Sequence, residues 1–180
     1  MTAMREVFIS VDVETSGPIP GEYSLLSIGA CNADAPDQTF FCELKPMTRK
    51  ADPKALEVTG LSLDRLEKEG FEPAVAMREF GDWVAKVVGA DAKPVFVGLN
   101  APFDWSFVNY NFHLFLGENP FGFAALDIKA LYMGATACSW AETSSNKMAG
   151  VLYPSSKGDH NALHDALYQA ELFRLIRQRA

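Results

Sequence analysis

The sequence contains little cysteine, no long apolar run and no excess of positive charge, and each absence narrows what the protein can be. Its three cysteines are odd in number and lack the spacing of metal ligands, so we expect reduced thiols in a cytoplasmic protein. No apolar run reaches the length that spans a membrane, and the first residues lead directly into a strand pattern. We therefore expect no membrane partner and no signal peptide.

The charge balance is acidic, with 16 Lys and Arg residues against 23 Asp and Glu residues and a net charge of −7. A protein that coats nucleic acid with high affinity needs a basic surface, so the composition disfavours this class. An enzyme that grips a short stretch of phosphate backbone stays compatible with the composition, because bound metal cations can supply positive charge locally.

Length and composition predict a single domain over residues 1–180. With 48% hydrophobic and 12% aromatic residues, the chain can bury a sizeable core. We find neither an internal repeat nor a boundary between two domains. Strand patterns over residues 7–15, 25–31 and 39–44 are separated by turn residues and predict an antiparallel meander.

The second half of the chain alternates between helix and strand patterns. Helices are predicted over residues 53–66, in short pieces, and over 72–88, 103–116, 128–133 and 161–179, with strands at 94–98 and 123–126. The fold class is therefore α/β, with a mixed sheet and helices on both faces. Asp127 is expected to cap the helix that follows it. Residues 134–159 lack apolar periodicity, so we expect a largely irregular, mobile connection with one short helix near 146–152.

Two carboxylates stand close together at the end of the first predicted strand. Strict alternation over residues 7–15 puts Asp12 and Glu14 on one face, with valines and an isoleucine on the other. Facing carboxylates repel each other, so a pair directed at one spot usually has a cation to offset the cost. A third acid, Asp104, begins the helix after the strand at 94–98 and meets this pair if the two strands are neighbours.

The last predicted helix carries His160 and Asp165 near its start. Residues five apart on a helix point about 140° away from each other, so both can face one site only if His160 precedes the helix or is its first residue. Asp159 or Asn161 then caps the helix, and Asp165 projects from its second turn. Taken alone, each of these acids and the histidine also fits a surface or capping role.

Three stretches together resemble the motifs of the DEDDh exonucleases, a family that includes ribonuclease T, oligoribonuclease and the proofreading subunit of the bacterial replicative polymerase. They are Asp12-Val13-Glu14-Thr15, Asn100-Ala101-Pro102-Phe103-Asp104, and His160 followed by Asp165, and they span residues 8–173. The resemblance implies a ribonuclease H-like fold with a five-stranded sheet, in which parallel strands follow the antiparallel meander. It also implies a 3′-to-5′ exonuclease that removes nucleotides from the 3′ end of single-stranded RNA or DNA.

The resemblance also assigns roles to individual residues. It implies that two Mg²⁺ or Mn²⁺ ions are held by four acids: Asp12, Glu14, Asp104 and Asp165. His160 corresponds to the general base, and three residues fall where the family contacts or frames the terminal nucleotide: Thr15, Asn100 and Phe103. Pro18 and Leu99 depart from the pattern, because some relatives carry a bulky apolar wedge and a histidine at these places.

This set of residues suits the hydrolysis of a phosphodiester bond. Two metal ions roughly 3.5 to 4 Å apart stabilise both the attacking and the leaving oxygen of an in-line displacement. Carboxylate oxygens favour Mg²⁺ or Mn²⁺ over softer metals, and a neutral imidazole can take a proton from water.

Several alternatives stay open. The protein could be a phosphodiesterase restricted to very short oligonucleotides, or a nucleic-acid-binding or scaffold module that has lost turnover. His160 and His164 have the spacing of a helical zinc-binding pair, and His164-Asp165 resembles the pair of HD-type phosphohydrolases. HD-type sites lie in all-helical domains and this chain opens with strands, so we expect His164 to be structural or peripheral. The sequence indicates neither a preference for RNA or DNA nor a polymerase partner, and it leaves open a homodimer of the kind several relatives form.

Overall fold

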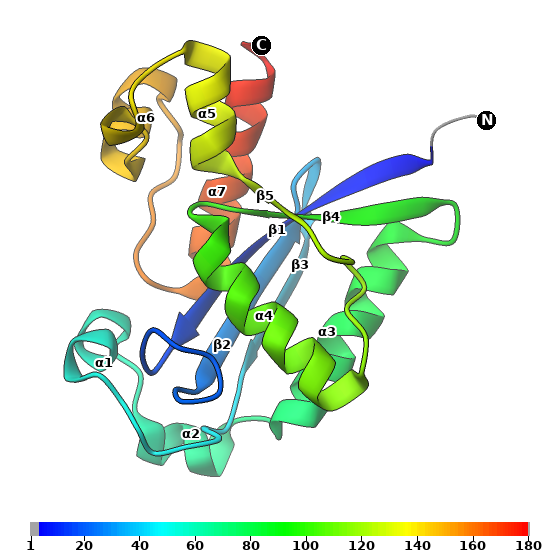
Figure 1. The fold of residues 1–180 in the computed structure, drawn as a ribbon, viewed down its shortest axis with the longest axis vertical. Coiled ribbons are helices and arrows are strands. Elements are labelled where there is room, and N and C mark those ends of the chain that lie inside the picture. The colour runs from blue at the N-terminus through cyan, green and yellow to red at the C-terminus, as the bar shows by residue number, and fades with distance from the viewer. Residues whose placement is uncertain (1–3, 180) are drawn as a thin grey trace.

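The computed structural model describes residues 4–179. At its centre is a five-stranded mixed sheet with the strand order β3-β2-β1-β4-β5 (Figure 1). The strands are β1 Arg5–Thr15, β2 Leu25–Asn32, β3 Ala35–Glu43, β4 Ala92–Gly98 and β5 Ala125–Asp127. The β1–β2 and β2–β3 pairs are antiparallel, whereas the β1–β4 and β4–β5 pairs are parallel. The predicted meander and the mixed sheet are confirmed.

Helices cover both faces of the sheet, as predicted (Figure 1). They are α1 Pro53–Thr59, α2 Leu63–Glu69, α3 Pro73–Val88, α4 Ala101–Leu116, α5 Ile128–Thr136, the 3-10 helix η1 Trp140–Glu142, α6 Ser145–Leu152 and α7 Ala162–Arg177. One face packs against α3 and α4, and the other packs against α7, which α5 and α6 flank. Among residues 4–179, no helix combines the length and the apolar character that spanning a bilayer requires.

The alternation along β1 divides its side chains between these two layers. The odd-numbered residues from Val7 to Val13 are buried in the core shared with α3 and α4. On the opposite face, Ser10 Oγ donates a hydrogen bond to the Ala166 carbonyl oxygen of α7 at 2.8 Å. Asp12 and Glu14 continue the row of Ser10 toward the strand end, so the sheet presents both carboxylates on the face that α7 covers.

The start of α7 lies directly against β2. Gly29 pairs with Asp12 in the sheet, and a Cβ on Gly29 would come within 2.1 Å of the carbonyl carbon of Ala162. Only glycine leaves room for the helix backbone at this point. Gly29 therefore sets how closely the first turn of α7, including Asp165, approaches the strand that carries Asp12.

We expect Gly29→Ala to lower the free energy of unfolding by about 1–3 kcal/mol, because the obstructing atoms belong to backbone and cannot swing aside. Urea unfolding measures the effect. The matched control is Gly134→Ala within α5, where a Cβ would meet nothing within 4 Å and alanine favours the helix. Equal stability of the two variants would show that α7 can shift away from β2 without cost.

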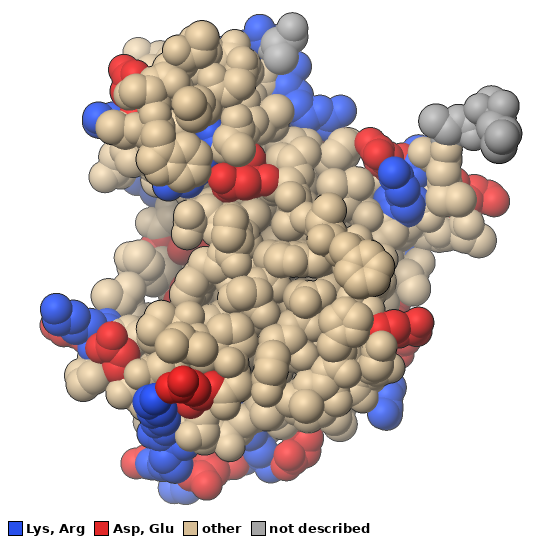
Figure 2. All heavy atoms as spheres, in the orientation of Figure 1, with Lys and Arg blue, Asp and Glu red and all other residues tan. Residues whose placement is uncertain are grey.

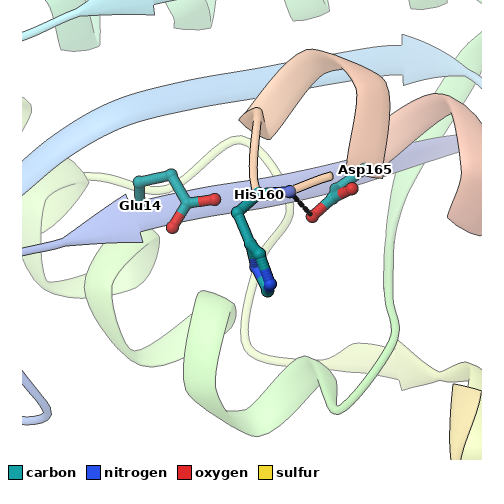
Figure 3. A group of neighbouring side chains, drawn as sticks. All are labelled: Glu14, His160 and Asp165. Carbon is teal, nitrogen blue, oxygen red and sulfur yellow. Dashed lines mark hydrogen bonds between the residues drawn. The ribbon is translucent and has the colours of Figure 1, made fainter. Parts of the chain in front are cut away.

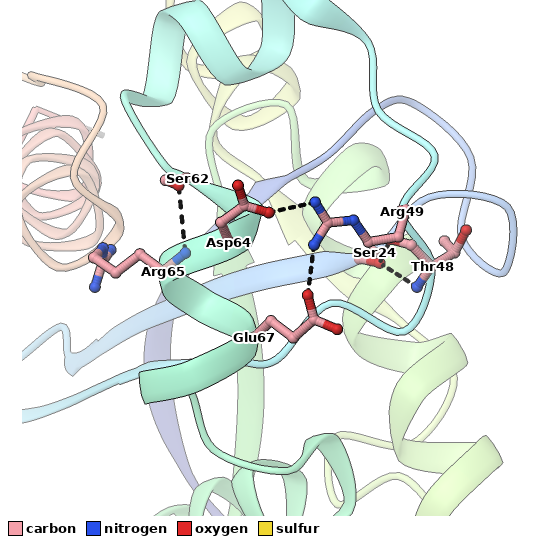
Figure 4. A network of polar contacts seen from close by, with 7 residues as sticks. All are labelled: Ser24, Thr48, Arg49, Ser62, Asp64, Arg65 and Glu67. Carbon is pink, nitrogen blue, oxygen red and sulfur yellow. Dashed lines mark hydrogen bonds and ion pairs between the residues drawn. The ribbon is translucent and has the colours of Figure 1, made fainter.

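The segment between β3 and α2 passes the end of β1 and is held by polar contacts (Figure 4). Arg49 pairs with both Asp64 and Glu67 of α2. The Asp52 N–H donates a hydrogen bond to the Ser16 carbonyl oxygen at 2.7 Å. These contacts place α1 beside the carboxyl end of β1, next to the acids.

The connection between α5 and α7 is more regular than the sequence predicts. The expected short helix near residues 146–152 is confirmed as α6. The expectation of a largely irregular segment over 134–159 is wrong, because α5 extends beyond residue 133 and η1 follows it. Ser139 and Glu142 form a reciprocal capping box that stabilises η1. The side chain of Met148 in α6 is buried in the same core cluster as residues of α7.

Candidate active site

The acids of β1 and α4 meet because β1 and β4 are parallel neighbours. Helix α4 begins soon after β4 ends, so its first turn lies beside the carboxyl end of β1. Asp104 is buried there, and its Oδ1 accepts a hydrogen bond from the Val13 N–H at 3.1 Å. Asp104 was expected to meet Asp12 and Glu14 if the strands before them are neighbours. The structure pairs β1 with β4 and brings Asp104 beside both acids.

His160 and Asp165 reach the site from the start of α7. His160 precedes the helix, one of the two places that the spacing allows, and Asn161 is the N-cap. Asp165 lies in the first turn rather than in the predicted second turn, because the helix begins only at Ala162. The Asp165 carboxylate accepts hydrogen bonds from the Asp159 N–H at 2.9 Å and from the His160 N–H at 3.2 Å, and Figure 3 shows the second of these.

Three of these groups lie close enough to share one ion. One ligand atom each from Glu14, His160 and Asp165 lies within 4.8 Å of the others (Figure 3). Asp12 belongs to the same cluster, because it interacts electrostatically with Glu14, Asp104 and Asp165. The five residues that the motifs single out therefore gather in one place, although they come from three distant parts of the chain.

The carboxylates of this cluster resist being ionised together. Burial raises the pKa of Asp12 well above its ordinary value, and the neighbouring charges of Asp104, Glu14 and Asp165 raise it further. Burial and then the charges of Asp165 and Asp104 raise the pKa of Glu14 to about 8. Burial also raises the pKa of Asp104 to about 7, although the hydrogen bond from Val13 opposes this. A hard divalent cation bound among these oxygens would reverse the shifts.

Metal-free protein should therefore lose stability as the pH rises through the neutral range. Folded Glu14 keeps its proton up to about pH 8, whereas an unfolded glutamate releases it near pH 4.3. Between these values the folded state binds more protons, so the free energy of unfolding falls with increasing pH. This contribution is complete below the unfolded pKa and is lost as the pH passes the folded one.

Melting temperatures in EDTA, measured across this pH range, test the expectation. Glu14→Gln removes one titrating group, so its melting temperature should depend less steeply on pH. Added Mg²⁺ should stabilise the wild type most at the alkaline end, where protons compete least for the carboxylates. A wild-type melting temperature that rises with pH in EDTA would contradict the mutual repulsion of these carboxylates.

Gln169 of α7 also belongs to the site, and the sequence analysis did not identify it. Its Nε2 donates a hydrogen bond to Asp12 Oδ1 at 2.5 Å, and its Oε1 accepts one from the Leu99 N–H at 2.9 Å. The buried amide thereby orients the Asp12 carboxylate and ties it to the end of β4. Its position four residues after Asp165, on the same face of α7, is the signal that could have identified it.

Asp127 caps α5, as predicted, and it also supports the second motif. Its side chain accepts hydrogen bonds from the backbone at the start of α5. Oδ1 accepts two more, from the N–H groups of Asn100 at 2.9 Å and Ala101 at 3.2 Å. Asn100 has a φ of 68°, which is unfavourable for most residues other than glycine. Asp127 thus holds the backbone of the motif in its left-handed conformation.

Two hollows border the acid cluster. The larger has a volume of about 540 Å³ and is lined by Asp12, His160 and Asp165, together with Lys157, Tyr168 and residues of α6. The candidate base His160 and the carboxylates of Asp12 and Asp165 therefore border the same hollow. Polar side chains and one lysine on its walls suit contact with a phosphate backbone.

The smaller hollow has a volume of about 290 Å³ and lies between the end of β1, α1 and α4. Glu14, Thr15 and Phe103 border it, and Val58 of α1 adds an apolar wall. Two of the three residues expected to frame a nucleotide therefore line one hollow. Asn100, the third, lines neither hollow and is placed instead by Asp127.

His164 does not join the cluster in the described part of the chain. Its Nδ1 lies 2.9 Å from Asp159 Oδ2 at the exposed start of α7. The close group consists of Glu14, His160 and Asp165, so the structure does not assemble a zinc pair from His160 and His164. The mixed sheet also excludes the all-helical setting of an HD-type site.

Comparison with known proteins identifies the family. A family model described as an exonuclease, RNase T, matches residues 9–173. The chain belongs to the RNase T exonuclease family. It is 58% identical over 176 residues to the 3′-5′ DNA exonuclease Cap18 of Escherichia coli, in an alignment that covers 98% of this chain and 94% of that protein. The 3′-to-5′ exonuclease of DEDDh type expected from the motifs is confirmed.

Solved structures of other nucleases share the fold. The nuclease domain of 3′hExo, a DEDDh family member bound to rAMP, matches with a TM-score of 0.78 at 16% identity, over 99% of this chain and 95% of that one. Escherichia coli exonuclease I in complex with a dT13 oligonucleotide matches with a TM-score of 0.75 at 16% identity, over 97% of this chain and 42% of that one. The predicted ribonuclease H-like α/β fold is confirmed.

Proposed function

We propose that this RNase T family exonuclease removes nucleotides from the 3′ end of single-stranded DNA by a mechanism that uses two divalent metal ions. The observation that carries the proposal is the convergence of four carboxylates and one imidazole on a single spot between β1, α4 and α7. DNA as the substrate is supported by the 58% identical relative, which is named a DNA exonuclease, and by the dT13 strand bound to exonuclease I.

The donor set fits hard divalent cations such as Mg²⁺ or Mn²⁺. Carboxylates whose mutual repulsion raises their pKa values gain most from a positive charge placed among them. The proposed ligands are Asp12, Glu14, Asp104 and Asp165. When bound, two ions would supply positive charge to the reacting phosphate and lower the pKa of water. This local charge offsets the net charge of −7 that otherwise repels a nucleic acid.

His160 is the proposed general base. Its side chain is exposed at the border of the larger hollow, so water can reach the ring. The imidazole lies near Glu14 and Asp165, which puts it beside the water that the site would activate. In this role His160 accepts a proton from the attacking water as the water oxygen bonds to phosphorus and the bond from phosphorus to the 3′ oxygen of the remaining strand breaks. Gln169 meanwhile keeps the Asp12 carboxylate turned toward the cluster.

The smaller hollow is the proposed site of the terminal nucleotide. Phe103 forms part of its wall and packs against Phe107, with ring centroids 5.4 Å apart. An aromatic wall contacts any base, which suits an enzyme that shortens strands of any sequence. Thr15 borders the same hollow, and the exposed side chain of Asn100 is free to contact the sugar or phosphate.

The face of the molecule seen in Figure 2 also favours a local grip on a strand end over extensive coating. In Figure 2 the centre of the viewed face carries few charged side chains, and its Lys and Arg residues lie mainly near the margins. This face offers no broad basic track for a long nucleic acid.

The proposal predicts that 5′-labelled single-stranded DNA is shortened step by step from its 3′ end in the presence of Mg²⁺ or Mn²⁺. RNA of the same sequence should be shortened more slowly, and EDTA should stop both reactions. A time course resolved on a sequencing gel measures this. Preferential cleavage of RNA would overturn the choice of DNA, whereas cleavage of dinucleotides alone would favour the short-oligonucleotide phosphodiesterase.

A further inference from the structure

The connection from α6 to α7, residues 153–161, carries His160 and runs beside α7 (Figure 1). One carboxylate of α7 holds the middle of this connection. Glu171 Oε1 accepts hydrogen bonds from the Ser155 N–H at 2.6 Å and from Ser155 Oγ at 2.8 Å. Glu171 Oε2 accepts two more, from the Ser156 N–H at 3.1 Å and from Ser156 Oγ at 2.7 Å. We call these three residues the Glu171 clamp.

The four contacts use the acceptor capacity of an ionised carboxylate on both of its oxygens. Partial burial raises the pKa of Glu171, but the hydrogen bonds from Ser155 and Ser156 together outweigh it, so the pKa lies below its ordinary value. Hydrogen bonds to an ionised acceptor are about twice as strong as those between neutral groups. The clamp is therefore a strong attachment of the connection to α7.

The connection needs such an attachment, because its backbone is not relaxed. Tyr153 and His160, near its two ends, have φ values of 54° and 62°. Left-handed conformations are uncommon for residues with a Cβ and persist where neighbouring contacts impose them. At Gly158 a Cβ would lie 2.7 Å from Asp165 Oδ1, so the chain also passes tightly against this acid.

Asp165 holds the far end of the connection through the N–H groups of Asp159 and His160. The same carboxylate is a proposed metal ligand, so its orientation has to suit both a bound metal ion and its hydrogen bonds to the connection. The Glu171 clamp lies outside the acid cluster, and Glu171 is not a proposed metal ligand. It can fix the approach to His160 whether or not a metal is bound.

We propose that Glu171 is a positioning residue that, through Ser155 and Ser156, holds His160 in the orientation needed to act as the base. The connection is thus attached at two points, at Glu171 and at Asp165. This inference rests on the proposed role of His160, so its test includes His160 itself.

The test is a double-mutant cycle of wild type, Glu171→Ala, His160→Ala and the double variant, with single-stranded DNA as substrate. Glu171→Ala should lower kcat by about 10- to 100-fold, since small displacements of a catalytic group have effects of this size. KM and the Mg²⁺ concentration at half-maximal rate should stay near the wild-type values. In the His160→Ala background, Glu171→Ala should not lower kcat any further, because the imidazole that Glu171 positions is no longer present.

Two further variants separate positioning from general stability. Glu171→Gln keeps one oxygen that can accept from the serines, so it should recover part of the lost rate. Glu142→Ala is the matched control, because Glu142 Oε2 also accepts hydrogen bonds from a serine N–H and Oγ, each at 3.0 Å, but in η1. It should leave kcat unchanged.

Each remaining outcome has one meaning. If His160→Ala keeps the full rate, the proposed base is wrong and the inference falls with it. If His160→Ala is slow but neither Glu171 variant is, the inference alone is wrong. If Glu171→Ala slows the His160→Ala enzyme by the same factor as the wild type, or if Glu171→Gln loses as much rate as Glu171→Ala, the clamp does not act through His160.

Discussion

Replacing Asp12 by asparagine should lower the rate of DNA hydrolysis by roughly 10³-fold or more, because the change removes a proposed metal ligand and, with it, several kcal/mol of transition-state stabilisation. Glu14, Asp104 and Asp165 all raise the pKa of Asp12 in addition to burial. Asp12 is also the acid that Gln169 orients. Asparagine keeps an oxygen for that hydrogen bond, so the change removes charge with little change of shape.

The same variant should not melt at a lower temperature than the wild type in EDTA. Removing one of several repelling carboxylates relieves the metal-free site, and the gain should grow as the pH rises and the remaining acids ionise. Added Mg²⁺ should stabilise the variant less than the wild type. Circular dichroism melts with and without Mg²⁺ and a gel assay of DNA cleavage measure both parts.

The matched control for this prediction is Asp37→Asn, which removes a carboxylate from an exposed position on β3. It should keep both the rate and the response to Mg²⁺. A wild-type rate in Asp12→Asn would exclude Asp12 as a metal ligand. An inactive variant that also melts well below the wild type in EDTA would show that Asp12 is needed for the fold.

The parts of this site that the sequence predicts are those set by local geometry. Alternation in a strand is a property of the pleat, so Asp12 and Glu14 could be placed on one face without knowledge of the fold. The helical period likewise required His160 to precede the helix that carries Asp165 or to be its first residue, and His160 precedes it. The three motifs then supplied the non-local step, namely that these groups and Asp104 belong together.

The missed features depend on contacts between segments far apart in the chain. Gln169 looks like an ordinary polar helix residue until Asp12 lies next to it, 157 positions away in the sequence. Glu171 resembles a solvated helix acid until Ser155 and Ser156 fold back on it. The short helix α6 was predicted, whereas the extension of α5 and the 3-10 helix η1 were missed, because the capping box of η1 involves too few residues to form a visible apolar period.

Replacing His160 by alanine should lower the rate by roughly 10²- to 10⁴-fold, the range that general-base catalysis contributes. Metal binding should persist, because the four carboxylates remain. The measurement pairs single-turnover cleavage of DNA with a Mn²⁺ titration followed by the shift in melting temperature. His164→Ala is the matched control, since His164 lies one helical turn further on and contacts Asp159 rather than the cluster.

The pairing of rate and metal affinity matters because the His160 ring lies within 4.8 Å of ligand atoms of both Glu14 and Asp165. That proximity would also suit a role of His160 as a metal ligand. A general base and a metal ligand predict different results for His160→Ala. A base can be replaced from solution, so imidazole added to His160→Ala should restore part of the rate through the 540 Å³ hollow that borders residue 160. A ligand would leave a weakened metal site, so half-saturation would need much more Mn²⁺ in His160→Ala. That second result would make His160 part of the metal cage and would require another group to accept the proton.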